Sequence, residues 1–176
     1  MAGVHKWDRG LDYSRTYAEI TSALGEAPVK AAVLLIALRN GARVGEAIEA
    51  YNEFCSSRER KVRARVEKRG FRYPKLHGRR VKGRGVLDKP VQRWIIIPPE
   101  IREGSRPYTR SSKNLSVWSM GKFGWNPHSL RYAFITYLSS RGEPPQTIAG
   151  ITGHKTLNEI LEYTQQRHSD EVLESL

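Results

Sequence analysis

The chain of 176 residues has little of what marks secreted, membrane or metal-binding proteins. Its single cysteine, Cys55, excludes an internal disulfide and fits a reducing compartment. No apolar run approaches the roughly 20 residues that span a bilayer, and the first twelve residues are too polar for a secretory signal. No His, Cys and Asp cluster has metal-ligand spacing. We therefore expect a cytoplasmic protein with no membrane contact, no metal and no other cofactor.

Acidic residues are scarce in one region, and this shortage accounts for the whole charge of the chain. Residues 58–93 contain fifteen lysines and arginines but only three acidic residues. The difference between these numbers equals the formal net charge of the whole chain, +12. Such a block repels itself unless a polyanion neutralises it, so we expect nucleic acid as the partner. A solvated basic loop without a partner is the alternative interpretation. The arginines that we expect to bind nucleic acid are Arg63, Arg65, Arg69, Arg79, Arg80 and Arg84.

Apolar residues repeat mostly at helical spacing, which predicts a mainly α-helical (α+β) chain with a small antiparallel β-sheet insert. The expected helices are 11–24, 28–38, 44–54, 115–123, one from Pro127 to Gly142, one from Pro144 to Gly153 and one from Thr156 onward. The expected strands are 60–67, with one cationic face, and 94–97. Trp94, Trp118 and Trp125 are predicted to lie in the core.

These elements make one domain at residues 11–167, with a lead-in at 1–10 and a tail at 168–176. The basic β region covers about 58–97, and Phe71 to Arg93 within it is too rich in glycine and arginine to assign.

Four side chains near the C-terminal end suit phosphate chemistry. His128 and Arg131 are three residues apart, hence neighbours on one face of a helix. His154 follows Gly153 in a predicted turn, and Tyr163 lies nine residues further on. Their spacing predicts a common surface.

This pattern resembles the C-terminal signature of the tyrosine recombinases, the phage-integrase and Xer-like family. The gap of 23 residues between Arg131 and His154 is similar to the family's usual spacing. Upstream, Gly41-Ala-Arg43-Val-Gly-Glu46 follows an apolar helix and resembles the context of the family's first arginine. The sequence Thr152-Gly-His, where Leu-Gly-His is usual, looks more like archaeal or viral members.

The resemblance implies roles for each residue in opening a DNA phosphodiester without metal or ATP. Tyr163 would be the nucleophile, and Arg43 and Arg131 would clamp the phosphate through their forked donors. His128 would act as base or hold the phosphate, while His154 would donate to a nonbridging oxygen. Glu46 would orient the cluster from behind.

The general acid of the family is a lysine on a β-hairpin, and this chain offers several. Lys68 ends the first predicted strand before a turn, and Lys82 lies in a Gly-Lys-Gly-like turn. Lys89 is a third candidate, and the choice stays open.

The partner implied is double-stranded DNA, on which the family acts as a homo-tetramer. Two other functions are compatible with the same residues. One is an inactive or truncated integrase remnant that only binds DNA. The other is a type IB topoisomerase-like enzyme that relaxes supercoils.

We predict that duplex DNA binds with an affinity that falls steeply with salt, because several phosphate contacts release counterions. Fluorescence anisotropy of a labelled duplex over a series of salt concentrations measures the slope of log affinity against log salt. A flat response would exclude the basic block as a phosphate-binding surface.

Overall fold

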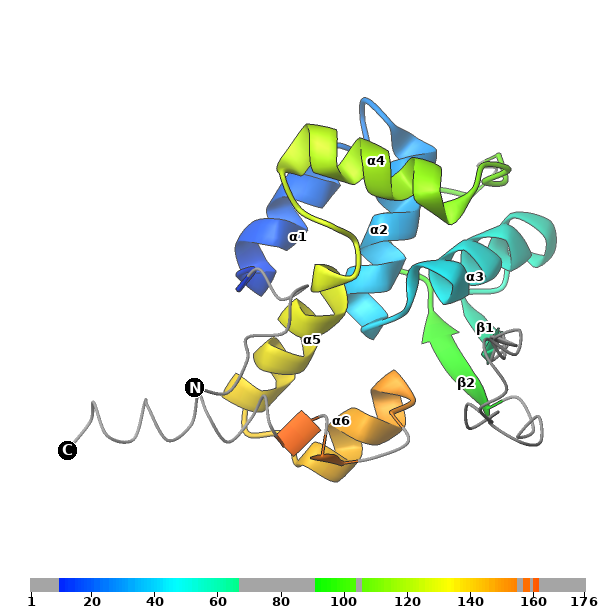
Figure 1. The fold of residues 1–176 in the computed structure, drawn as a ribbon. Coiled ribbons are helices and arrows are strands. Elements are labelled where there is room, and N and C mark those ends of the chain that lie inside the picture. Colours follow the sequence, from blue (N-terminus) through cyan, green and yellow to red (C-terminus); the bar gives the residue numbers. More distant parts are fainter. Residues whose placement is uncertain (1–9, 67–90, 104–105, 155–156, 159, 162–176) are drawn as a thin grey trace, which may run out of the picture.

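The computed structural model describes residues 10–66, 91–103, 106–154, 157–158 and 160–161 (Figure 1). Within these ranges the chain is mainly helical, with a two-stranded antiparallel sheet, which confirms the predicted fold class. The elements are α1 (Tyr13–Ser22), α2 (Pro28–Asn40), α3 (Val44–Ser57), β1 (Lys61–Val66), β2 (Val91–Ile96), α4 (Ser112–Phe123), α5 (Ser129–Ser140) and α6 (Pro145–Thr152).

Helix α2 is the centre of the core. It is apolar on all sides, and every residue from Ala31 to Leu38 is buried. Helices α1, α3 and α5 and strand β2 all contact it (Figure 1). A helix buried on every side cannot tilt or slide easily, so its C-terminal end is a fixed point for the segments that follow.

Glycines in the left-handed conformation end three of the described helices, α2, α4 and α6. Gly41 follows α2 with φ of 53°, and Gly153 follows α6 with φ of 70°. At Gly41 a side chain is also excluded by packing, because a Cβ there would lie 2.5 Å from Cδ1 of Phe134 on α5. The end of α2 therefore fits directly against α5.

The sheet pairs β1 with β2, and its two faces differ sharply. Val62 pairs with Ile95 on the inner face, and both are buried under α2 and α3. Arg63 pairs with Trp94 on the outer face, where both are exposed. The strand prediction for 60–67 is confirmed for the described residues 61–66, with the cationic face outward.

Trp94 corrects one expectation, since it was predicted to be a core residue and is 48% exposed. The alternation of β2 turns Arg93 inward instead, where it is only 6% exposed. Trp125 is buried as expected, and Trp118 packs against the core from a half-buried position.

The predicted boundaries shift where capping decides them. Helix α4 begins at Ser112 rather than Leu115, because the Ser111 side chain accepts a hydrogen bond from the Asn114 N–H. Helix α5 begins at Ser129, so His128 is its N-cap residue and not part of its first turn.

None of the helices in the described ranges is long and apolar enough to cross a membrane.

We predict that Gly41→Ala lowers the free energy of unfolding by about 2–4 kcal/mol, from left-handed strain plus overpacking. Gly142→Ala is the matched control, because Gly142 has φ of 79° but nothing within 4 Å of an added Cβ. It should lose only the strain term of about 1–2 kcal/mol. Urea unfolding followed by circular dichroism measures both, and equal losses would contradict the close packing at Gly41.

Candidate active site

Four helix ends meet at one place, and the predicted phosphate-binding residues lie there. The C-terminal ends of α2 and α6 approach the first turns of α3 and α5 (Figure 1). Five side chains lie there in two hydrogen-bonded sets, one around Glu46 and one between Arg131 and His154, and we call the five together the Arg–His cluster. Its members are Arg43, Glu46, Arg93, Arg131 and His154.

Glu46 lies in the first turn of α3 and is 5% exposed. Its Oε2 accepts the backbone N–H of Arg43 at 3.1 Å, and its Oε1 accepts Nη1 of Arg43 at 2.9 Å. Burial alone would raise the pKa of Glu46, but the Arg93 charge and the bonds from Arg93 and Arg43 hold it below its usual value. Glu46 is therefore an ionised residue that fixes the backbone and side chain of Arg43.

Arg93 is a member of the cluster that the sequence did not indicate. Its Nε and Nη2 both donate to Oε2 of Glu46, at 3.1 and 2.7 Å. Its Nη1 donates to the backbone carbonyls of Asn40, at 3.1 Å, and Ile151. Arg93 thus joins strand β2 to the ends of α2 and α6 and the start of α3. It had been counted as part of the basic block facing a polyanion, and its burial removes it from that surface.

Arg131 is 2% exposed and lies across the end of α2. Its Nη1 donates to the Gly41 carbonyl at 2.6 Å, and its Nη2 lies 3.1 and 3.2 Å from Nε2 and Nδ1 of His154. Burial, and then the charge of Arg43, lower the pKa of Arg131 to about 9. The guanidinium is still a cation at neutral pH, but burial and the neighbouring Arg43 charge disfavour its charged form.

His154 follows the left-handed Gly153, as predicted. Its Nδ1 lies 2.6 Å from Oγ1 of Thr152, and its backbone N–H donates to the Ala149 carbonyl at 3.1 Å. Burial, and then the charges of Arg131, Arg43 and Arg93, lower the pKa of His154 to about 4. The imidazole is therefore neutral at neutral pH.

His128 is half-buried at the N-cap of α5, with its ring edge-on to Tyr132 at 5.2 Å between centroids. Burial, followed by the charges of Arg131 and Arg43, lowers its pKa. The structure thus brings His128, Arg131, Arg43, Glu46 and His154 into one electrostatic neighbourhood.

The charge balance of the cluster favours an anion. The cluster contains three guanidinium groups but one carboxylate, that of Glu46, which pairs with Arg43 and Arg93, and the neighbouring imidazoles are neutral. Arg43 is the most accessible member, with 44% of its side chain exposed. An anion arriving from solvent can therefore contact Arg43 and reduce the repulsion felt by Arg131.

The outer face of the sheet carries a second, smaller arrangement that suits nucleic acid. Lys61 and Arg63 each place their charged group 4.7 Å from the ring centroid of Trp94. Ile96 beside them is 52% exposed. Basic side chains around an exposed aromatic ring are typical of surfaces that contact the nucleic-acid backbone and bases.

Several predicted residues lie outside the described ranges or are described only by their backbone. Outside them lie the predicted nucleophile, the three candidate general acids and four arginines of the basic block: Tyr163, Lys68, Lys82, Lys89, Arg69, Arg79, Arg80 and Arg84. The helix expected from Thr156 falls largely outside, and the tail 168–176 wholly so. Arg65 is placed on β1 only by its backbone.

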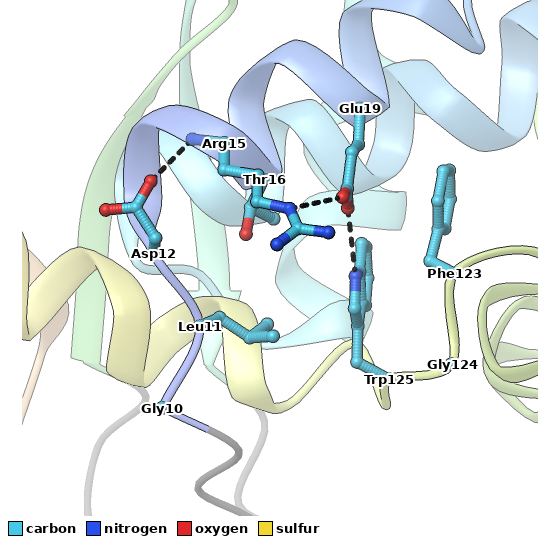
Figure 2. A pocket seen from close by; sticks show the side chains of 9 residues that line it. All are labelled: Gly10, Leu11, Asp12, Arg15, Thr16, Glu19, Phe123, Gly124 and Trp125. Carbon is cyan, nitrogen blue, oxygen red and sulfur yellow. Dashed lines mark hydrogen bonds and ion pairs between the residues drawn. The ribbon is translucent and has the colours of Figure 1, made fainter.

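A hollow of about 420 Å³ lies elsewhere, between α1 and the turn after α4 (Figure 2). Its polar groups bond one another: Arg15 pairs with Glu19 at 3.1 Å, and Nε1 of Trp125 reaches Glu19 at 3.5 Å. None of the predicted site residues lines it. The described ranges also contain no group of three or more His, Cys, Asp or Glu residues that could hold a metal ion.

We predict that Arg93→Ala destabilises the fold by about 3–5 kcal/mol, because it leaves a buried carboxylate with one partner fewer. Arg63→Ala, on the exposed face of the same sheet, is the control and should change stability by about 0.5 kcal/mol or less. Chemical denaturation of both variants gives the comparison. Similar values for the two would mean that Arg93 does not hold the cluster together.

Comparison with known proteins places this arrangement in a family. The chain matches no protein-family model. It is 31% identical over 185 residues to ORF241 of Acidianus two-tailed virus, which is provisionally named an integrase; the match covers 97% of this chain and 68% of the relative. It is 29% identical to the uncharacterised protein MJ0770 of Methanocaldococcus jannaschii, covering 97% and 88%. V10 of Sputnik virophage, also provisionally named an integrase, is 25% identical, covering 96% and 89%.

The fold is similar to that of the Tn1549 transposon integrase, solved with DNA. In the complex with transposon right-end DNA the TM-score is 0.56 at 14% identity, covering 98% of this chain and 68% of that one. In a complex with circular-intermediate DNA it is 0.53 at 15% identity, and the match spans 62% of that chain, less than two thirds of its length. The sequence relatives and the fold agree with the motifs around Arg43, Arg131 and His154: the chain belongs to the tyrosine recombinase/integrase family.

Proposed function

We propose that this chain, through its domain at residues 11–167, is the catalytic domain of a site-specific DNA recombinase. The observation that carries the proposal is the Arg–His cluster, in which residues from four separate elements converge where an anion can contact Arg43. The outer sheet face adds Lys61, Arg63 and Trp94 as DNA contacts. The partner is double-stranded DNA, and strand exchange between two sites implies a homo-tetramer on it.

The reaction needs a nucleophile, charge neutralisation and a proton for the leaving group. The Tyr163 phenol oxygen attacks phosphorus, its proton passes to a base such as His128, and the bond from phosphorus to the 5′ oxygen breaks. The 5′ oxygen takes a proton from a lysine, for which Lys68, Lys82 and Lys89 are the candidates. The 3′-phosphotyrosyl bond preserves the energy of the phosphodiester, so a 5′ hydroxyl reverses the step without ATP.

Arg43 and Arg131 neutralise the nonbridging oxygens in this scheme. Arg131 is held rigidly by the Gly41 carbonyl, and Arg43 is held by Glu46, so both charges are in place before DNA arrives. Such preorganised donors stabilise a developing charge without the cost of reorienting them.

A duplex with a nick close to the cleavage site tests the proposal. After cleavage, the short fragment that carries the new 5′ hydroxyl diffuses away, so religation is prevented and the covalent intermediate accumulates. Because the target sequence is not known, the substrate is a pool of labelled nicked duplexes with a randomised core. We expect an adduct that survives SDS with the unaltered chain and none with Tyr163→Phe. Binding without any adduct would indicate a DNA-binding remnant.

Arg131→Ala in the same assay should reduce cleavage by at least about a hundredfold, the usual loss on removing one transition-state donor. It should spare most duplex affinity, because the basic block supplies it. A parallel loss of binding would contradict the assigned role.

A separate assay distinguishes a recombinase from a type IB topoisomerase-like enzyme. A recombinase exchanges strands between two captured sites, whereas the topoisomerase-like enzyme only relaxes a supercoiled plasmid.

A further inference from the structure

Thr152 is a fully buried polar residue that links the end of α6 to the imidazole of His154. Its exposed fraction is 0%. Its Oγ1 lies 2.6 Å from the Ile148 carbonyl and 2.6 Å from Nδ1 of His154. Its Cγ2 would lie 2.9 Å from a Cβ at Gly41, so the side chain is also held by packing at the junction of α2 and α6. The Thr152 side chain is therefore fixed by two short contacts of its hydroxyl and by close packing of its methyl group against Gly41.

The hydroxyl has one proton, and the two short contacts decide where it goes. The Ile148 carbonyl can only accept, so a contact of 2.6 Å between two oxygens requires the Thr152 proton to lie between them. Oγ1 is then an acceptor toward His154, and Nδ1 must carry a proton. The reverse arrangement, with Oγ1 donating to Nδ1, would press two oxygen lone pairs together in a buried site.

The contact of His154 with Arg131 is compatible with the same tautomer. Nη2 of Arg131 lies 3.1 Å from Nε2, and a guanidinium can only donate. With Nδ1 protonated toward Thr152, Nε2 is the ring nitrogen that is left to accept from Nη2. Nη2 is also 3.2 Å from Nδ1, but the proton of that nitrogen points to the closer Thr152 oxygen. The Nδ1–H tautomer satisfies both ring nitrogens with these two partners.

We propose that Thr152 is a positioning residue that holds His154 as the Nδ1–H tautomer and presents an unprotonated Nε2 to Arg131 and to the incoming phosphate. The identity of the anion rests on the proposed function, whereas the tautomer does not. A valine or leucine at position 152 has no acceptor for Nδ1–H and would release this constraint.

The tautomer has a consequence for binding, since Nε2 can donate to a phosphate oxygen only after gaining a second proton. The charged groups that face His154 are Arg131 from α5, Arg43 and Glu46 from the start of α3, and Arg93 from β2. Among the residues that the structure describes, the three guanidinium groups oppose an imidazolium and Glu46 favours it. A bound phosphodiester offsets the guanidinium charges, so DNA binding takes up one proton from solvent at Nε2 and strengthens as the pH falls.

Nitrogen NMR on histidine-labelled protein without DNA tests the tautomer directly. The His154 ring signals are assigned by their loss in His154→Gln. We expect a protonated Nδ1 and an unprotonated Nε2 at neutral pH in the unaltered chain and in Thr152→Ser. Thr152→Val, which keeps the shape but lacks the hydroxyl, should shift the population toward Nε2–H. A protonated Nε2 in the unaltered chain, or no change in Thr152→Val, would overturn the proposal.

Anisotropy with a labelled duplex tests the proton uptake. From about pH 7.5 to about pH 5.5 the affinity of the unaltered chain should rise by up to about tenfold per pH unit, the limit for one proton. His154→Gln should remove this component, and Thr152→Val should weaken it, while thermal unfolding shows that both variants are folded. A pH slope unchanged by either variant would overturn the linkage.

Failure of the proposed function would look different. It would give no covalent adduct, and the tautomer result would be unaffected, because the NMR measurement uses no DNA. With inorganic phosphate as the probe, the same resonances then show whether an anion at the cluster raises the protonation of His154. Absence of that response would again count against the linkage.

Discussion

The fold and the site both depend on one buried carboxylate, that of Glu46, shared between two arginines. A charged group this deeply buried is stable only when it is paired and hydrogen-bonded, and Arg93 and Arg43 together supply four donors. Because Arg93 is on β2 and Arg43 precedes α3, the pairing fixes the sheet relative to the helices. The same carboxylate therefore determines how the core is joined and where the accessible guanidinium of Arg43 lies.

The ends of two helices are held by the same kind of contact. The carbonyls of Asn40 and Gly41 at the end of α2, and of Ile151 near the end of α6, all accept from the guanidinium groups of Arg93 or Arg131. Cations are favourable at helix C-terminal ends, where carbonyls are left without partners. Helix-end carbonyls thus partly stabilise the positive charge at the site. Because they take the place of acidic side chains, several arginines can lie close together without additional carboxylates, which would repel phosphate.

The sequence predicts what is encoded locally and fails where partners are distant. Gly41 and Gly153 mark helix ends by their backbone preference, and the spacing of Arg131 and His154 follows from the elements between them. Trp94 was predicted to be a core residue and Arg93 was counted with the basic block, and both predictions are wrong. The two residues follow a basic, glycine-rich stretch, and the sequence alone does not show which face of a short strand is buried. The partners that hold Arg93 inside are distant in sequence: Glu46, 47 positions earlier, and the carbonyls of Asn40 and Ile151. Thr152 was noted as a departure from the family pattern, but its contact with His154 needs coordinates.

The cluster also explains how affinity for phosphate can arise without large movement. Arg131 is buried, close to two further guanidinium groups, and its lowered pKa reflects the free energy that burial and this repulsion cost. An anion that contacts Arg43 reduces the repulsion among all three, so part of its binding free energy is relief of a strain already present in the fold. Since the Gly41 carbonyl and Glu46 prevent the arginines from separating, the fold cannot relieve that strain by itself. Rigid arginines with too few anionic partners stabilise the negative charge that develops on the phosphate oxygens better than flexible lysines would. Their orientation is fixed before the reaction begins.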